Sequence, residues 1–202
     1  WIAIVLLAFA GQIAWVIENS WFNTFVNDVI SPDPKVISLM VALSAITATL
    51  TTLIMGTLSD RLGKRKIMIL VSYVLWGIST MVFPAAGAVK SATLAVVAVL
   101  ALDCLMTFFG STANDASFNA WLTNITDETN RGTVSGITEL FPLLAMVVTT
   151  IVSGMLIEYF GYTLFFTSMG LLVVVCGLIG GLLMKEAPIP KVEGERTGFW
   201  KQ

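Results

Sequence analysis

The sequence predicts an all-α membrane protein, a bundle of six transmembrane helices, and three observations support this. The chain is 56% hydrophobic and 12% charged, whereas a soluble domain carries about a quarter charged residues. Long apolar runs follow one another with short polar connections. One loop pattern also recurs ninety-eight residues along the chain, which indicates an internal repeat.

Six apolar runs reach the roughly 20 residues that a helix needs to cross a bilayer. They cover about 2–27, 36–57, 67–86, 93–119, 134–158 and 163–184. The first connection, Ser31 to Pro34, is a turn by composition, because proline cannot extend a helix. We therefore expect residues 1–186 to form one six-helix unit, and residues 187–202 to begin a cytoplasmic linker to a missing second half.

The repeated loop has the pattern Gly-x-Leu-x-acid-x-apolar-Gly. It occurs over residues 56–63, directly before a cluster of cations, and again over residues 154–161 without them. A loop that recurs after an odd number of crossings faces the other side of the membrane, where Lys and Arg are disfavoured. The pattern therefore predicts a 3+3 inverted repeat, the plan of many secondary transporters.

The distribution of cations predicts the orientation. Nine of the eleven Lys and Arg residues fall in the second loop, the fourth loop and the tail. These are Arg61, Lys64, Arg65, Lys66, Arg131, Lys185, Lys191, Arg196 and Lys201. The opposite side holds Lys35 and Lys90. We therefore expect a multi-pass protein of the plasma (inner) membrane with both termini in the cytoplasm.

Several kinds of chemistry have no support in the sequence. The chain has no histidine, which excludes an imidazole relay or a histidine metal site, and Cys104 and Cys176 fall inside apolar runs. No phosphate loop or reactive cysteine supports an enzyme. We expect no metal, cofactor or nucleic acid. The expected partners are the lipid bilayer, a polar solute, a monovalent cation and the second half.

Polar residues in the first apolar run predict a solute site. Gln12, Asn19 and Asn23 share one helix face, because steps of seven and four residues return to the same line. Glu18 lies on a different line, beside Trp15. Amides and a carboxylate can bind the hydroxyl groups of a ligand whose apolar face lies on aromatic rings. Alternatively, the amides join helices and the tryptophan belongs to an interfacial belt.

The fourth apolar run predicts a site for a coupling cation, either a proton or sodium. Residues 110–119 are polar on every side of a helix and so cannot face lipid. Asp115 shares a face with Ser111 and Asn119, whose oxygens suit a hard cation. Asp103 lies on a neighbouring face and joins this candidate set. Alternatively, Asp115 snorkels to the surface or caps the next loop.

The basic loop and its surroundings predict a cytoplasmic gate. The candidate gating residues are Gly56, Asp60, Arg61, Gly63, Lys64, Arg65, Arg131 and Glu139. Asp60 precedes the cations by one turn, and Glu139 lies one turn before Pro142, where it could pair with Arg131 or with the basic loop. The alternative is that the loop is a topology signal only, although such a signal needs the cations alone.

Residues 56–66, Gly-Thr-Leu-Ser-Asp-Arg-Leu-Gly-Lys-Arg-Lys, resemble the signature loop between helices two and three of the major facilitator superfamily. The resemblance covers about residues 1–186. It implies the N-terminal six-helix half of a twelve-helix carrier.

A narrower resemblance is to the glycoside-pentoside-hexuronide:cation symporters, the group of the melibiose permease. It rests on Phe25 to Ile30, on Leu53 to Gly56, and on Asp115-x-x-Phe118 followed by Ile125-Thr126 and Arg131. It implies that Asp115 lies at a cation-binding Asp and Gln12 at a sugar-binding Asp of that group. Two further Asp positions of the group are Ala48 and Thr52 here, which favours a proton, or no coupling, over sodium.

The leading functional hypothesis is a secondary active transporter that couples symport of a sugar or similar polar solute to a cation by alternating access. The alternative is a proton-driven exporter of small apolar compounds. Exporters of this superfamily usually carry a Gly-Pro motif in helix five and an Arg in helix four, and neither occurs here. A non-transporting membrane receptor is a remote alternative.

Overall fold

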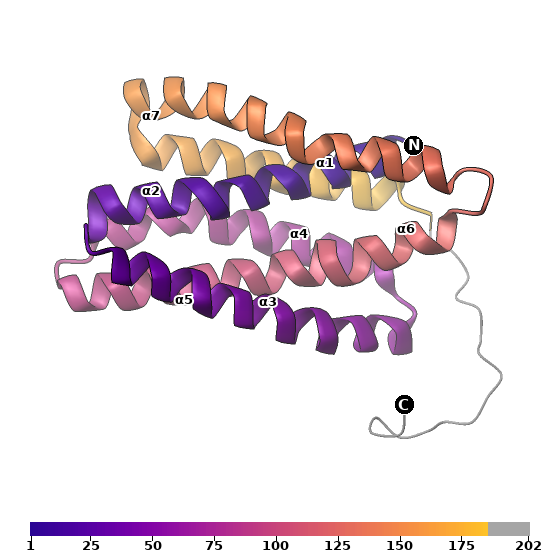
Figure 1. Ribbon diagram of the computed structural model, residues 1–202, viewed down its shortest axis with the longest axis horizontal. Helices are drawn as coiled ribbons and strands as arrows, with labels where there is room; N and C mark the ends of the chain where they lie inside the picture. The colour runs from indigo at the N-terminus through magenta and orange to yellow at the C-terminus, as the bar shows by residue number, and fades with distance from the viewer. Residues whose placement is uncertain (186–202) are drawn as a thin grey trace.

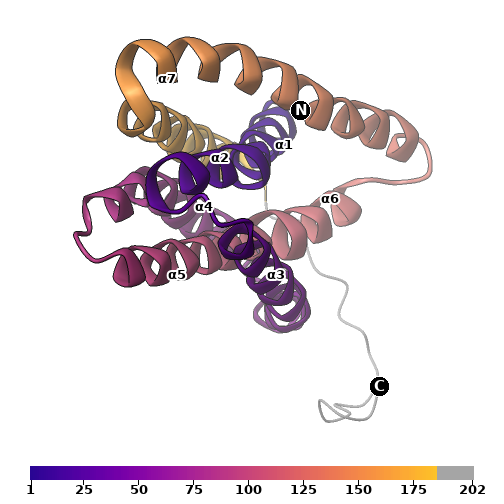
Figure 2. The ribbon, with the colours of Figure 1, turned by 60° about the vertical axis from the view of Figure 1, so that its left-hand side comes forward.

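The computed structural model describes residues 1–185 as a bundle of long helices (Figures 1 and 2). In this part of the chain, five helices are long and apolar enough to cross a membrane. They are Ile2–Ile30, Pro34–Leu62, Arg65–Ala88, Ala92–Ile125 and Arg131–Leu183. The predicted all-helical membrane fold is confirmed. The expected linker, with Lys191, Arg196 and Lys201, lies outside the described residues.

Several of the long helices change their winding along their length. The first consists of α1 (Ile2–Val16), the π-helical η1 (Ile17–Phe22), α2 (Asn23–Phe25) and the π-helical η2 (Val26–Ile30). The second is α3 (Pro34–Leu62), and the third joins α4 (Arg65–Val82) to a 3₁₀ turn, η3 (Phe83–Ala88). The fourth consists of α5 (Ala92–Gly110), the π-helical η4 (Ser111–Phe118) and α6 (Asn119–Ile125). The last is α7 (Arg131–Leu183).

Helix α7 contains two helical segments that meet at Gly161. The backbone there has φ 79° and ψ 173°, outside the helical region, and Figure 1 shows the chain turning back at this end of the bundle. Glycine suits this position because a positive φ is unfavourable for residues with a Cβ. The fifth and sixth predicted segments, 134–158 and 163–184, therefore lie on either side of this turn.

The second segment of α7 packs between α1 and α4. Gly177 leaves no room for a side chain against Tyr73 of α4, and Gly180 leaves none against Leu7 of α1. Helix α3 lies on the opposite side of the bundle from the first segment of α7 (Figure 2) and packs against α5 and η4. These contacts arrange the first, second and fourth helices around a common interior.

A close backbone contact joins α4 to α7. A Cβ built on Gly77 would lie 2.5 Å from the carbonyl oxygen of Gly170, and a Cβ built on Gly170 would lie 2.5 Å from that of Gly77. Real Cβ atoms do not approach an oxygen so closely. Only a pair of glycines allows these two helices to cross at this distance.

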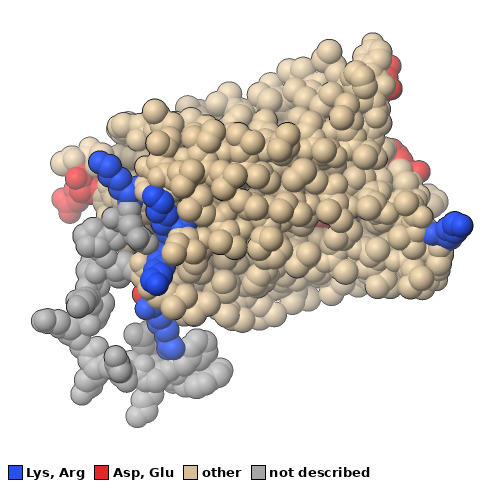
Figure 3. Space-filling model, turned by 180° about the vertical axis from the view of Figure 1, so that it is seen from behind, with Lys and Arg blue, Asp and Glu red and all other residues tan. Residues whose placement is uncertain are grey.

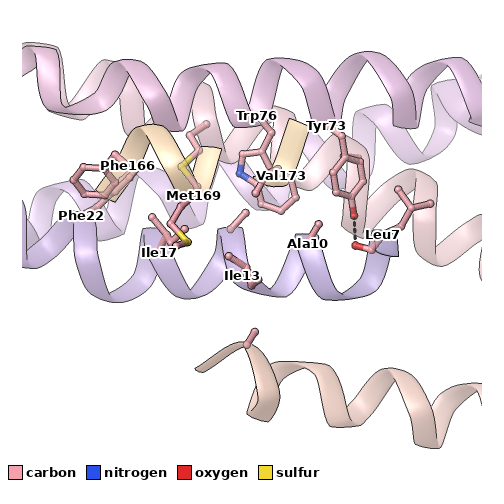
Figure 4. Packing of buried hydrophobic residues seen from close by; sticks show 14 of the residues in the cluster. Leu7, Ala10, Ile13, Ile17, Phe22, Tyr73, Trp76, Phe166, Met169 and Val173 are labelled. Atoms are coloured by element: carbon pink, nitrogen blue, oxygen red, sulfur yellow. Dashed lines mark hydrogen bonds between the residues drawn. The ribbon is translucent and has the colours of Figure 1, made fainter. Parts of the chain in front are cut away.

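The core beside α1 is aromatic. Tyr73 and Trp76 of α4 are fully buried, and the Tyr73 hydroxyl donates a 2.7 Å hydrogen bond to the Leu7 carbonyl (Figure 4). Trp15 meets Trp76 edge to face with ring centroids 5.1 Å apart. This packing positions the Trp15 ring, which borders both cavities described below.

The described Lys and Arg side chains gather at one end of the molecule. Figure 3 shows this cluster at the end where the described chain stops, whereas Lys35 and Lys90 lie within or next to connections at the opposite end. Between α6 and α7 the exposed Asp127 carboxylate accepts hydrogen bonds from the Thr129 hydroxyl at 2.5 Å and from the Thr129 N–H at 2.9 Å. These hydrogen bonds lower the pKa of Asp127 and close the loop.

Candidate functional site

The first cavity, of about 170 Å³, opens between the first, second and fourth helices. Its lining combines one aromatic ring, two carboxylates, two amides and two hydroxyls with apolar residues of α3. The lining residues are Trp15, Glu18, Asn19, Asn23, Met40, Val41, Ser44, Ala45, Ala48, Asp103 and Thr107. Predicted members of the solute site and of the cation site thus meet in one cavity.

Hydroxyl groups connect the two carboxylates of this cavity. The Thr107 hydroxyl donates to Oε1 of Glu18 at 2.8 Å and lies 3.0 Å from Oγ of Ser44. Ser44 in turn donates to Oδ2 of Asp103. Glu18 is 7% exposed, Asp103 1% and Thr107 0%, so both carboxylates lie inside the protein, whereas Ser44 is partly exposed.

The amides of the first cavity bind their own helix. Nδ2 of Asn19 donates to the Trp15 carbonyl at 2.8 Å, and Nδ2 of Asn23 donates to the Asn19 carbonyl at 2.8 Å. Their amide oxygens remain to accept from a ligand, and Oδ1 of Asn23 is buried without a hydrogen-bond partner among the described residues. A solute hydroxyl could supply that missing donor.

A second cavity, of about 310 Å³, lies between α1, the π-helix η4, α6 and α7. It is lined by Ala8, Gln12, Trp15, Asn114, Asp115, Phe118, Asn119, Leu122, Thr138, Glu139 and Pro142. Nδ2 of Asn114 donates to Oδ1 of Asp115 at 3.3 Å. This cavity holds Asp115 and Gln12 but neither Glu18 nor Asp103.

Both cavities border a π-helical stretch. Glu18 belongs to η1, while Asn114 and Asp115 belong to η4. The wider turn of a π-helix changes which side chains share a face, and such turns are frequent at functional sites. Face assignments based on 3.6 residues per turn therefore lose their register in these stretches.

The basic loop connects four helices, α3, α4, α6 and α7, at one end of the bundle. Arg65 pairs with Asp60 at 2.5 Å, and its other guanidinium nitrogen donates to the Ala120 carbonyl of α6 at 2.9 Å. Nζ of Lys66 donates to the carbonyls of Leu182 and Met184, at 2.9 Å each. The loop thereby holds the ends of α6 and α7 against the turn between α3 and α4.

Three further gate candidates, Glu139, Gly63 and Gly56, take no part in the contacts that Arg65 and Lys66 make with α6 and α7. Glu139 lines the second cavity, and no ion pair joins it to Arg131 or to the basic loop within residues 1–185. Gly63 ends α3 with φ 65°, and a Cβ on Gly56 would meet nothing within 4 Å. The gating roles of these residues stay predictions.

A family model for the major facilitator superfamily matches residues 1–201. The chain belongs to that superfamily. A curated relative, sugar efflux transporter A of Dickeya chrysanthemi, is 26% identical over 197 residues, which is 96% of this chain and 48% of the relative. The chain thus spans about half the length of that relative. Membership of the superfamily assigns the chain to a family of membrane transporters rather than to one of enzymes.

Within this superfamily fold, the structure regroups the residues predicted from the sequence. Gln12, expected beside Glu18, lies in the second cavity, and Asp103, expected beside Asp115, lies in the first. Among residues 1–185, Trp15 alone lines both cavities. Asn119 lines the second cavity together with Asp115, whereas Ser111 is fully buried and is not part of that lining.

Sequence reasoning passed over Ser44 as a site residue. It lies in an otherwise apolar stretch of α3, where a single serine is unremarkable. Its role becomes visible only when α3 is placed against α5, because its partner Asp103 is fifty-nine residues away. Ala48, one turn after Ser44, could have indicated that this face of α3 borders a site. It aligns with an acidic position of the melibiose permease group, and it lines the first cavity.

Proposed function

We propose that this chain is the N-terminal half of a secondary active transporter for a sugar or a similar polar solute, which works by alternating access. The observation that carries the proposal is the first cavity, where carboxylates, amides and an aromatic ring border one space inside a superfamily fold. The name of the curated relative, a sugar efflux transporter, supports the same solute class.

The chemistry of the cavity suits a polyhydroxylated solute. Carboxylate and amide oxygens accept hydrogen bonds from hydroxyl groups, and the Trp15 ring offers an apolar surface for the C–H face of a sugar ring. Buried groups such as Oδ1 of Asn23 gain a partner when the solute enters. An apolar compound would leave them without one, which argues against the alternative exporter of apolar compounds.

The proposal includes a C-terminal second half and a 3+3 inverted repeat within this half. The coverage of 48% of the relative leaves room for a C-terminal six-helix half, and a solute would bind between the two halves near the bilayer midplane. The 3+3 inverted repeat is supported by Gly63 and Gly161, which close the repeated sequence pattern and both end a helical segment with positive φ.

The orientation is proposed from the charge distribution. The cluster of described cations at one end supports a cytoplasmic position for the basic loop and both termini, in the plasma membrane. In this orientation the second cavity lies toward the cytoplasm. The first cavity lies further from it.

Coupling to a cation is proposed as well. The sequence predicts symport through Asp115. The name of the curated relative describes efflux of a sugar, and for this chain an inward proton gradient would drive that direction only by exchange. Ala48 and Thr52 provide no carboxylate on α3, which argues against a sodium site of the melibiose permease type. The carboxylates of the two cavities can serve a proton in either direction of solute transport.

The test is transport by the full-length protein in proteoliposomes. Counterflow of a labelled glucoside, galactoside and pentose, each with and without a pH gradient or sodium, separates solute from coupling ion. We expect counterflow of at least one sugar and accumulation driven by a pH gradient. Failure to move any of these sugars, with transport of apolar cations instead, would favour the exporter.

A further inference from the structure

Four side-chain groups form a continuous chain of oxygen atoms across three helices. Oγ1 of Thr107 lies 2.8 Å from Oε1 of Glu18 and 3.0 Å from Oγ of Ser44. Ser44 Oγ reaches Oδ2 of Asp103. The order is carboxyl, hydroxyl, hydroxyl, carboxyl, so three hydrogen-bonding contacts connect four groups.

The hydrogen atoms available to these four side-chain groups can be counted. Each contact needs one hydrogen, a hydroxyl group supplies one, and an ionised carboxylate supplies none. Ser44 and Thr107 together supply two hydrogens for three contacts. The carbonyl oxygen of Asp103, 2.9 Å from Oγ1 of Thr107, competes for one of them. The missing hydrogen must come from a carboxylic acid, at Glu18 or at Asp103.

The unpaired oxygens of the two carboxyl groups support the same count. Oε2 of Glu18 and Oδ1 of Asp103 are buried and have no hydrogen-bond partner within residues 1–185. Both side chains are more than nine-tenths buried and border the first cavity. Two ionised carboxylates would lose most of their hydration here and gain only one hydroxyl donor each, whereas one protonated acid leaves a single charge on the pair.

The surroundings supply no positive charge. α3 contributes Ser44 to the cavity and no titratable group. α4 contributes the buried Tyr73, whose hydroxyl donates to a backbone carbonyl of α1. η4 and α7 contribute Asp115 and Glu139, which are acidic and line the second cavity. Among the described residues, no Lys or Arg lines either cavity.

We propose that Glu18 and Asp103 hold one shared proton, which moves between them through the hydroxyl groups of Thr107 and Ser44. In one direction Glu18 gives its proton to Thr107, Thr107 gives its own to Ser44, and Ser44 gives its own to Oδ2 of Asp103. Each hydroxyl oxygen loses one O–H bond and gains one. The negative charge moves from Asp103 to Glu18, and the total number of protons is unchanged.

This inference rests on the proposed function for one further step, the coupling of the proton to transport. A sugar in the first cavity competes for the hydroxyl groups of Ser44 and Thr107, because its own hydroxyls bind the same oxygens. It thereby interrupts the bridge that retains the proton. Proton and sugar then exclude one another, which is the condition for exchanging an incoming proton for an outgoing sugar.

Infrared difference spectroscopy of the purified full-length protein at pH 7 tests the shared proton directly. The variants are Glu18→Gln and Asp103→Asn, because an amide can donate or accept and so closes the bridge without the extra proton. We expect each variant to lose the same carbonyl band of one protonated acid, and the double variant to lose nothing more. Asp115→Asn is the matched control and should retain the band.

Other spectra would overturn the proposal. Loss of two different bands in the two variants would mean that each acid holds its own proton, and no loss in either would mean that both are ionised. A band that disappears on addition of sodium chloride would identify a sodium site instead.

The coupling step has a separate readout. In weakly buffered solution, the sugar with the strongest counterflow should release about one proton from the wild type and none from either variant. Release from the variants as well would place the coupling proton elsewhere. A shared band in a protein that transports no sugar would contradict the proposed function alone, and sugar transport without the band would contradict the shared proton alone.

Discussion

The two cavities of the bundle differ in how their acidic groups are held. In the first, Glu18 and Asp103 are almost fully buried, and hydroxyls from two other positions connect them. In the second, Asp115 is partly exposed with a 3.3 Å amide contact, and Glu139 is exposed. Both cavities border the same ring, Trp15, and both include a π-helical stretch.

This difference shows that the polarity of a sequence segment does not identify the cavity whose acidic groups are best connected by hydrogen bonds. Residues 110–119 are strongly polar, yet the better connected acid pair involves Asp103, one residue in an apolar stretch. A buried acid is informative through its partners and its unpaired oxygens rather than through its neighbours in sequence. Substitutions in each cavity can separate binding of the solute from binding of the coupling proton.

The largest effect is expected from removing the acids. Glu18→Gln and Asp103→Asn should each reduce gradient-driven sugar transport to background while counterflow continues, because the site still opens without a proton to exchange. Asp115→Asn, predicted from the sequence to have this effect, is the direct comparison. Transport assays in proteoliposomes with an imposed pH gradient measure all three. Loss in Asp115→Asn alone would move coupling to the second cavity.

The next largest effect is expected on sugar affinity, from substitution of Trp15, whose ring borders both cavities. Trp15→Ala should weaken sugar affinity roughly 10-fold, because an aromatic surface contributes about 0.5–1.5 kcal/mol beyond its buried area. Trp15→Phe keeps part of the surface and should lose less. Affinity is measured by the half-saturation concentration of counterflow. Equal affinity in wild type and Trp15→Ala would assign the ring to core packing against Trp76.

A third comparison separates the amides. Asn23→Ala should weaken sugar binding by about 1–3 kcal/mol, since the solute hydroxyl loses an acceptor in a buried site. Gln12→Ala, in the second cavity, should change affinity less. Competition binding with the transported sugar measures both. The reverse order would place the solute in the second cavity, as the resemblance of Gln12 to a sugar-binding position implies.

The smallest effect is expected from a substitution outside both cavities, in the basic loop. Asp60→Asn removes the charge opposite Arg65, but the Asp60 side chain is 62% exposed, so stability should change by less than about 1 kcal/mol. Transport should slow while sugar affinity stays near the wild-type value, because the contact holds helix ends rather than solute. Glu128→Gln, an exposed loop change, is the control. Wild-type rates in Asp60→Asn would reduce the loop to a topology signal.

The fold could be predicted from the sequence because the bilayer imposes it. The lengths of the apolar runs predicted the helices, and the prolines after Ser31 predicted the first turn. The glycines that close the repeated pattern coincide with the two helix ends at Gly63 and Gly161. The site could be predicted only in composition. Contacts between Ser44 and Asp103 depend on how two helices face each other, and the π-helical turns shift the side chains that a regular helix would align.

The glycine pair of α4 and α7 has a mechanical consequence. Because the Gly77 and Gly170 backbones touch, sliding one helix along the other would press Val174 or Met81 into a space that holds no side chain. Translation along the axes is therefore blocked, while rotation of the two helices together remains free. Any motion that exposes the cavities to alternate sides must carry α4 and the second segment of α7 as one rigid body. Gly77→Ala would force the two helices apart at this crossing, because the added methyl group would lie 2.5 Å from the Gly170 carbonyl oxygen, and it would do so from a position outside both cavities.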